Sequence, residues 1–296
     1  MKKYFMLTFI LFTLIIYFFY NSKETILITK DNINLFFNVL LPTLFPYMIL
    51  VLLFVNYKCH LIIAYLIQYI SIPLFKISGK SFSIVLLGIL GGYPLISLLG
   101  KEIINEDNKK ELNKLIPLFS FPSLSFLLNI INVNSKINFL LFYLLSSFII
   151  LFMFKDNKQI KYISLHDISK EFTTNNNYIS IFSKTLFKSL STLSLIFSNL
   201  LFFSLFKTLF KFNNEKINNI FLGLFEFSRS SIYLSNNINS SLDIIILGSL
   251  LLFGGLNILM QIYIIYNDSH LLNFRVFIKY RMLLVIIYAL LIFLFI

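Results

Sequence analysis

The sequence has few of the residues that build disulfides, metal sites and hydrolytic active sites. It contains a single cysteine, Cys59, which excludes a disulfide within the chain. Its three histidines are dispersed through polar connectors, and no His-Glu-x-x-His, paired cysteines, Gly-x-Ser-x-Gly or phosphate-binding loop occurs. We therefore expect a protein that is not an enzyme and that holds no cofactor and no metal.

Charged residues are also scarce, and acidic ones most of all. Lysine and arginine number 25 against 13 aspartates and glutamates, so the formal net charge is +12. A basic balance can indicate nucleic-acid binding, but these lysines lie between apolar runs and form no patch with interleaved aromatic residues. Positive residues beside membrane segments orient a protein in the bilayer. We expect the lipid bilayer as a partner, and no nucleic acid.

Apolar side chains are what the sequence has in abundance. Hydrophobic residues make up 58% of the 296 positions, and the mean hydropathy is +0.84. A spanning helix needs about 20 apolar residues, so the chain has room for about 8 to 10 membrane segments. The composition predicts an all-α, polytopic integral membrane protein that crosses the cell membrane several times.

Polar connectors divide the chain into four parts. The first is a membrane anchor helix and loop, because its apolar run lacks the small-residue cleavage site of a signal peptide. A first half, a cytoplasmic lysine-rich loop, and a second half with a C-terminal helix follow. The boundaries of the four parts are 1–34, 35–154, 155–184 and 185–296.

Two apolar segments have an ambiguous path. Residues 61–75 are short for a span, and residues 217–234 contain charges, so each segment either crosses the membrane or re-enters it. If 217–234 is re-entrant, Arg275, Lys279 and Arg281 fall on the cytoplasmic side with the other lysine-rich loops. The positive-inside rule therefore favours a re-entrant path for this segment.

An apolar run from Phe82 to Leu99 contains Gly91-Gly92-Tyr93-Pro94. Paired glycines tolerate unusual dihedral angles, and proline removes a backbone donor, so the helix should bend or break here. Broken backbone is tolerated in hydrocarbon only where protein buries it or where it lines a watery cavity. The motif is either a packing kink or an interior site, and Tyr93 is either a hydroxyl donor there or an interfacial anchor.

Two further stretches interrupt apolar runs in a similar way. Pro122 is flanked by small polar residues that include Ser123, and Gly254-Gly255 lies within the run 244–266. Proline and paired glycines are the residues most often found where membrane helices are interrupted. We count all four residues as candidate solute-binding positions.

The two halves carry similar patterns. Phe121-x-x-Leu124-x-x-Leu127-x-Asn129 recurs as Phe253-x-x-Leu256-x-x-Leu259-x-Gln261. Gly88 precedes the first pattern as Gly223 precedes the second, and when these two glycines are aligned Gly91 falls opposite Glu226. Repeats with interrupted helices in corresponding positions are typical of transporters that bind their substrate at the repeat interface. The amides of Asn129 and Gln261 either join helices by hydrogen bonds or contact a solute.

Glu226 and Arg229 are the charged residues that we place inside a membrane segment. A charge at the bilayer centre costs about 2.5 to 3.5 kcal/mol on insertion scales, so an intramembrane glutamate indicates function by default. Their i, i+3 spacing allows an ion pair along one helix face. Either this pair only orients a buried helix, or Glu226 binds a solute or a proton while Arg229 holds its charge state.

Five short motifs resemble, in order, those of the YlbJ-type sporulation integral membrane proteins, over about residues 35–265. That family belongs to a wider group with nucleoside-recognition, or gate, domains. The resemblance implies a structure of gate-like halves with broken or re-entrant helices. It also implies location in a sporulation-stage membrane, a requirement for the protein in spore cortex formation, and other sporulation membrane proteins as partners. A transport role is implied but unproven for the family. The motifs are Leu41 to Tyr47, Gly91 to Pro94, Phe119 to Phe126, Leu224 to Glu226, and Phe253 to Gly255 with Gln261.

The chain departs from the family pattern at three places. Ile96-Ser97 replaces a small Gly-Ala pair, and Phe121 and Leu124 replace an asparagine and a second proline. A Thr-Asn-Gly-like turn after Glu226 is also absent. These changes remove polar contacts expected of a nucleoside site. The resemblance therefore implies the family's helical scaffold, but it does not identify the ligand.

Our leading hypothesis is a permease-like gate for a small polar solute, nucleoside-like or of another class. The alternative is a non-transporting membrane scaffold that recruits cortex-building proteins through lysine-rich loops such as the one with Lys155, Lys158 and Lys161. The predicted solute-binding residues are Gly91, Gly92, Tyr93, Pro94, Pro122, Ser123, Asn129, Glu226, Arg229, Gly254, Gly255 and Gln261.

Overall fold

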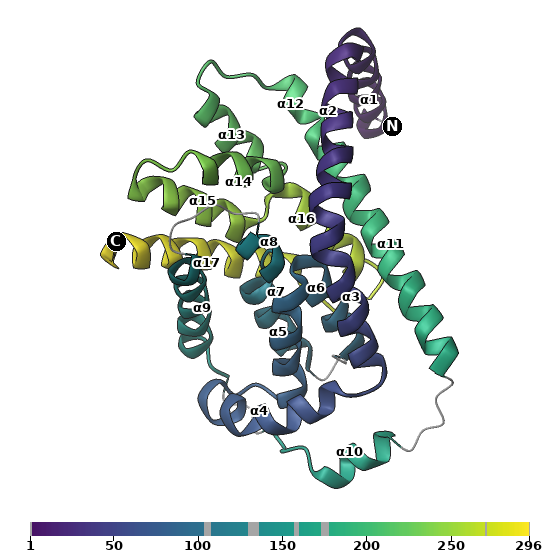
Figure 1. Ribbon diagram of the computed structural model, residues 1–296, viewed down its shortest axis with the longest axis vertical. Helices are drawn as coiled ribbons and strands as arrows, with labels where there is room; N and C mark the ends of the chain where they lie inside the picture. The colour runs from purple at the N-terminus through teal and green to yellow at the C-terminus, as the bar shows by residue number, and fades with distance from the viewer. Residues whose placement is uncertain are drawn as a thin grey trace.

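The computed structural model describes residues 2–103, 108–129, 136–156, 160–172, 178–269 and 271–295. Every regular element in this part of the chain is a helix, and Figure 1 shows how the helices are arranged. They are α1 (Lys2–Tyr20), α2 (Ser22–Leu35), the π-helix η1 (Phe36–Leu40), α3 (Leu41–Asn56), α4 (His60–Phe75), α5 (Gly79–Gly91), α6 (Tyr93–Ile103), α7 (Lys109–Phe119), α8 (Leu124–Asn129), α9 (Lys136–Met153), α10 (Leu165–Phe172), α11 (Tyr178–Ser204), α12 (Phe206–Leu209), α13 (Glu215–Gly223), α14 (Phe227–Asn236), α15 (Ser241–Phe253), α16 (Gly255–Tyr266) and α17 (Phe274–Phe295).

Four continuous helical stretches in the described residues are long and apolar enough to cross a membrane. A fifth is present if α4 and α5 form one broken span. The helix direction bends by 105° between them. This arrangement is consistent with an all-α membrane protein that crosses the bilayer several times, as the composition predicted. The four stretches are Ser22–Asn56, Tyr178–Leu209, Ser241–Tyr266 and Phe274–Phe295.

The count is lower than the 8 to 10 membrane segments expected from the sequence. Several apolar runs are interrupted and fold as short helices, such as α13 and α14 in place of one helix over residues 217–234. The described parts of α1 and α9, Tyr4–Tyr20 and Phe139–Met153, are also short. Total apolar length overestimates the number of full spans because glycine and proline divide the runs.

The predicted break at the paired glycines is confirmed. Helix α5 ends at Gly91, and Gly92 has φ 77° and ψ −160° before α6 begins at Tyr93. This region of dihedral space is open almost only to glycine. An added Cβ on Gly92 would lie 2.5 Å from the backbone nitrogen of Ser123, so the glycine is also required for close packing.

The other interruptions follow the same local chemistry. Helix α7 ends at Phe119, and the chain is non-helical through Pro122 until α8 begins. Helix α15 ends before Gly254 and Gly255, which both have positive φ, at 81° and 71°. The sequence patterns therefore located three breaks, and the break between α13 and α14 lies at Leu224 to Glu226.

The interrupted helices are held in the interior by the longer ones. In Figure 1, the continuous α2–η1–α3 helix and the long α11 run side by side along one flank, and α4 lies across the lower end. Helix α17 packs against α7, α9 and α15. Gly248 of α15 allows this approach, because an added Cβ would overlap the ring of Tyr288 on α17.

Replacing Gly92 by alanine should destabilise the protein. The substitution forces a side chain into a glycine-only conformation, which costs about 1 to 3 kcal/mol, and places Cβ against backbone atoms that cannot rotate away. We expect the apparent unfolding temperature of the detergent-purified protein to fall by several degrees. Gly223→Ala is the control, because an added Cβ there meets only side-chain atoms, at 3.1 Å or more. Equal stability of the two variants would contradict this role.

Candidate functional site

All four interrupted helix pairs contribute to one pocket in the interior, which we call the central pocket. The space in and around it that is not occupied by atoms, including space open to the surroundings, is about 450 Å³. Helices η1, α3 and α11 complete its wall, so residues from both halves of the chain surround it. The lining residues are Leu40, Thr43, Leu44, Tyr93, Pro94, Pro122, Ser123, Phe126, Ile196, Leu200, Phe227, Ser228, Asn257, Ile258 and Gln261.

The amide of Gln261 is the polar group in the central pocket that has no partner. Its side chain is only 1% exposed, and neither Nε2 nor Oε1 makes a hydrogen bond within the described residues. Buried amides are nearly always hydrogen-bonded, because an unpaired one costs about 1 to 3 kcal/mol. Of the two roles that the sequence left open for Gln261, the hydrogen bonds that would join helices are not made within the described residues, so a contact with a solute remains as its candidate role.

The other polar side chains of the central pocket already make hydrogen bonds. Oδ1 of Asn257 accepts a hydrogen bond from the backbone of Ile258 at 2.9 Å, and its Nδ2 donates to Glu226 Oε1 at 3.5 Å. Ser123 Oγ accepts from the backbone of Phe126 at 3.2 Å, in the first turn of α8. The rest of the wall is mainly apolar and aromatic.

Tyr93 supplies an aromatic wall and also supports the backbone. Its hydroxyl donates a hydrogen bond to the carbonyl oxygen of Leu251, in the last turn of α15 before the glycine break. Its ring meets that of Phe227 edge to face, with centroids 5.3 Å apart. Tyr93 is 2% exposed, so the alternative that it anchors the protein at the membrane interface is wrong.

Glu226 and Arg229 do not form the ion pair that their spacing suggested. Glu226 precedes α14 and accepts hydrogen bonds from the backbone nitrogens of Ser228 and Arg229, at 2.7 and 3.1 Å. The Arg229 guanidinium turns away and binds Asp31 of α2 at 2.8 Å. The carboxylate is used as a helix N-cap, because the break leaves the first amides of α14 without intrahelical partners.

A second pocket, which we call the side pocket, lies on the other side of Glu226. It contains about 360 Å³ of unoccupied space and is more polar than the central pocket. Glu226 is 5% exposed and lines this pocket, while Asn257 connects it to the central one. The side pocket is lined by Ile28, Asn32, Phe203, Ser204, Lys207, Asn219, Leu222, Glu226, Arg229 and Ser230.

The structure brings together five of the twelve predicted solute-binding residues in the central pocket, and it places two more in the side pocket. The central five are Tyr93, Pro94, Pro122, Ser123 and Gln261, and the other two are Glu226 and Arg229.

Four of the remaining five predicted residues, all of them glycines, line neither pocket. Gly91 and Gly92 end α5, and Gly92 packs on the backbone near Ser123. An added Cβ on Gly254 would lie 3.3 Å from the ring of Tyr93, and one on Gly255 would lie 2.9 Å from the carbonyl oxygen of Gly223. These glycines shape the breaks. The side chain of Asn129 lies outside the described residues.

The sequence analysis missed Arg281, the largest fully buried side chain among the described residues. Its Nη1 donates to the carbonyl oxygen of Pro117 at 2.8 Å and to that of Ser120. The guanidinium carbon lies 5.4 Å from the centroid of the Tyr93 ring, within the range of a cation–π contact. It thus binds the carbonyls that the break after α7 leaves unpaired.

A signal for Arg281 was present in the sequence. Arg281, together with Arg275 and Lys279, looked like part of a basic segment that flanks the last apolar run. The buried residues of α17 fall at spacings of three and four, and Arg281 lies on the same face as Phe277, Leu284 and Tyr288. A charge on the buried face of an apolar helix indicates an interior partner.

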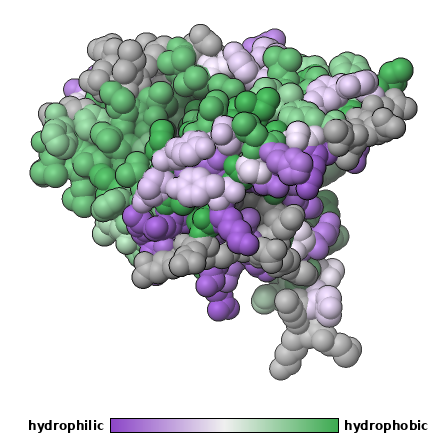
Figure 2. Space-filling view, turned by 90° about the horizontal axis from the view of Figure 1, so that it is seen from below, coloured by the Kyte–Doolittle hydropathy of each residue, from purple (hydrophilic) through white to green (hydrophobic). Residues whose placement is uncertain are grey.

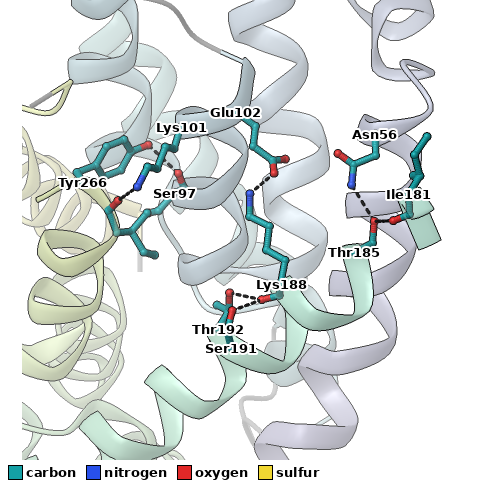
Figure 3. A network of polar contacts seen from close by, with 11 residues as sticks. Asn56, Ser97, Lys101, Glu102, Ile181, Thr185, Lys188, Ser191, Thr192 and Tyr266 are labelled. Carbon is teal, nitrogen blue, oxygen red and sulfur yellow. Dashed lines mark hydrogen bonds and ion pairs between the residues drawn. The ribbon is translucent and has the colours of Figure 1, made fainter. Parts of the chain in front are cut away.

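A polar network ties α6 to α16 and to α11 (Figure 3). The hydroxyl of Tyr266 donates to the carbonyl oxygen of Ser97, and Nζ of Lys101 donates to that of Ile265, both at 2.8 Å. These bonds join α6 to α16. In the same region the ammonium of Lys188 on α11 pairs with Glu102 of α6.

The described fold is all-helical, its four or five long apolar stretches are compatible with an all-α membrane protein, and its interrupted helices meet around one pocket. No family model, no curated protein and no solved structure matches the chain. Within the described residues, no three His, Cys, Asp or Glu side chains lie close enough to hold a metal ion together.

Replacing Arg281 by glutamine should strongly destabilise the protein. The shorter side chain cannot reach both carbonyls, and each buried group left unpaired costs about 1 to 3 kcal/mol. We expect little folded protein at the temperature at which the wild type is stable, measured by size-exclusion chromatography after graded heating in detergent. Arg275→Gln removes the same charge from an exposed position on the same helix and should behave like the wild type. Similar curves for both variants would rule out the carbonyl-binding role.

The N-cap role of Glu226 predicts a ranking of substitutions. Glu226→Ala removes both acceptor oxygens and should lower stability by about 1 kcal/mol, whereas Glu226→Asp retains a preferred capping group and should recover most of it. Thermal unfolding in detergent measures both effects. Asp268→Ala is the control, because that carboxylate is exposed. An alanine variant as stable as the aspartate variant would show that capping is not what Glu226 contributes.

Proposed function

We propose that this protein is a permease-like membrane protein whose central pocket receives a small, uncharged polar solute. The observation that carries the proposal is the Gln261 amide: the residue lines the central pocket, its side chain is buried, and neither the donor nor the acceptor of the amide is paired within the described residues. A solute that offers both an acceptor and a donor would pair with this amide and recover the cost of burying it. Amide, lactam and base-like edges have this chemistry.

The charge of the lining supports an uncharged solute. No Asp, Glu, Lys or Arg side chain is among the described residues that line the central pocket, and burying an unpaired ion there would be costly. Phe126, Phe227 and Tyr93 provide flat aromatic surfaces on which a ring can pack. Ligand pockets typically combine such apolar walls with a few convergent polar groups.

The order of the helix breaks supports two related gate-like halves. The first half contains the interrupted pairs α5–α6 and α7–α8, and the second contains α13–α14 and α15–α16. The register that aligns Phe121 with Phe253 also aligns Gly92 with Leu224 and Pro122 with Gly254. All four of these latter residues lie within breaks. Binding where two such repeats meet is the arrangement known from transporters with discontinuous helices.

We also propose, on the motif resemblance, that the protein belongs with the YlbJ-type sporulation membrane proteins. A role in spore cortex formation, a sporulation-stage membrane and other sporulation membrane proteins as partners follow from that resemblance. Of its motifs, the Gly-Gly-Tyr-Pro stretch contributes Tyr93 and Pro94 to the central pocket, and the last contributes Gln261. The solute-binding proposal rests on the pocket and does not require the resemblance.

Gln261→Ala should reduce solute uptake about tenfold or more, because it removes the one unpaired donor–acceptor group of the pocket. The measurement is uptake of radiolabelled uridine, a neutral probe with an amide-like edge, by the purified protein in liposomes. Gln68→Ala is the matched control. Gln68 is also a fully buried glutamine, but both of its amide atoms are bound to the backbone of Ile163, far from the central pocket.

The two variants separate loss of binding from loss of structure. We expect uptake by Gln68→Ala to match that of the wild type per folded molecule, even where its stability is lower. Equal uptake by Gln261→Ala and the wild type would remove this amide from the mechanism. No uptake above empty liposomes by the wild type, for uridine and for a panel of other neutral solutes, would overturn the permease proposal and favour the membrane scaffold.

A further inference from the structure

A separate cavity, which we call the basal cavity, opens at the end of the molecule where α4 lies. It contains about 930 Å³ of unoccupied space. Figure 2 views the molecule from this end and shows hydrophilic residues gathered beside a broad hydrophobic area. The cavity is lined by Val55, Asn56, Lys58, His60, Leu61, Lys80, Glu102, Ile103, Glu171 and Lys184, none of which lines the central pocket.

The described lining of the basal cavity has an excess of positive charge. Both glutamates are engaged, since Glu102 pairs with Lys188 beside the cavity and Glu171 lies 3.9 Å from Lys58. Lys80 and Lys184 have no carboxylate partner in the part of the chain that the structure describes. Two ammonium groups on separate helices therefore face the same cavity with their charge uncompensated, which favours an anionic ligand.

A buried polar group in the wall also points to a ligand. The side chain of His60 is only 5% exposed, and its Nδ1 has no partner at hydrogen-bond geometry within the described residues. His60 is the first residue of α4, and Lys80 lies in the first turn of α5. The N-terminal ends of these two helices add the positive end of the helix dipole to the lysine charges.

Exposed apolar side chains lie on α4 and α11, two of the helices that line the basal cavity. Ile62 follows His60 by two residues on α4 and is 50% exposed, and Phe182 precedes Lys184 by two residues on α11 and is 47% exposed. Apolar surface beside a cationic cavity matches the two parts of an anionic phospholipid, with the acyl chains against the helices and the phosphate inside. Basic pockets between membrane helices bind lipid headgroups by this chemistry.

We propose that the basal cavity is a binding site for the phosphate of an anionic phospholipid, held by Lys80 and Lys184. The positive-inside rule assigns the lysine-rich loops on this side to the cytoplasm, so the lipid comes from the cytoplasmic leaflet. The chemistry recognised is a phosphate anion, and a soluble phosphate compound is the other possible source. The site is independent of the solute proposed for the central pocket.

The test compares three probes with the purified full-length protein in a neutral detergent at low salt. The probes are dioctanoyl phosphatidylglycerol, dioctanoyl phosphatidylcholine and glycerol 3-phosphate. The test variant carries Lys80→Gln and Lys184→Gln, and the control carries Lys23→Gln and Lys30→Gln, which remove the same charge from exposed positions on α2. Each lysine near an anionic headgroup contributes about tenfold or less, so the test variant should bind phosphatidylglycerol about 30-fold more weakly.

The outcomes distinguish the sources. Binding of phosphatidylglycerol in preference to phosphatidylcholine, lost in the test variant and retained in the control, supports the proposal. Glycerol 3-phosphate that binds as tightly as phosphatidylglycerol and competes with it would overturn the lipid assignment in favour of a soluble phosphate. Equal binding of the two lipids, or equal weakening in both variants, would overturn the site. Unfolding temperatures without lipid show whether each variant is folded.

Discussion

The structure depends on how the backbone groups freed at the helix breaks are satisfied. A bilayer offers them no water, so each must find a partner in the protein at a cost of several kcal/mol if it does not. The carbonyl oxygen of Leu251 receives the hydroxyl of Tyr93, and that of Leu118 receives the hydroxyls of Tyr143 and Ser147. Almost every such partner comes from an element distant in sequence. The breaks and the assembly of the helices therefore stabilise each other.

The pairing of backbone groups at the breaks also determines which polar groups remain in the central pocket. Between α13 and α14 the carbonyls of Leu224 and Phe225 accept the first amides of α16, at 2.7 and 3.0 Å, and the carboxylate of Glu226 accepts those of α14. Because the broken backbone is satisfied internally, the polar capacity left to the pocket comes from side chains. Among the described residues that line this pocket, Gln261 is the group whose buried polar atoms are left unpaired, and that is why the proposed function rests on it.

The central pocket and the basal cavity differ in the polarity and the burial of their linings. The central pocket is enclosed by apolar and aromatic residues and excludes charge from its described lining, whereas the basal cavity exposes uncompensated lysines next to apolar helix faces. A neutral pocket lined by buried residues suits an uncharged solute, and a cationic cavity lined in part by half-buried and exposed residues suits an anion that stays partly hydrated. The two proposed sites thus differ in ligand class because they differ in burial.

Composition and local motifs were enough to indicate the class of the protein and three of the places where its helices break. Composition alone indicates a bilayer protein, and the limits that Gly92, Pro122 and the Gly254-Gly255 pair place on the backbone are local, so they act whatever lies nearby. Only the tertiary structure decided the partners of the charged residues. Arg229 binds Asp31 instead of Glu226, and Arg281 inserts into the core, because the groups that hold them lie more than 150 residues away along the chain. The same long-range packing decided that the Gln261 amide stays free, a property that no local pattern encodes.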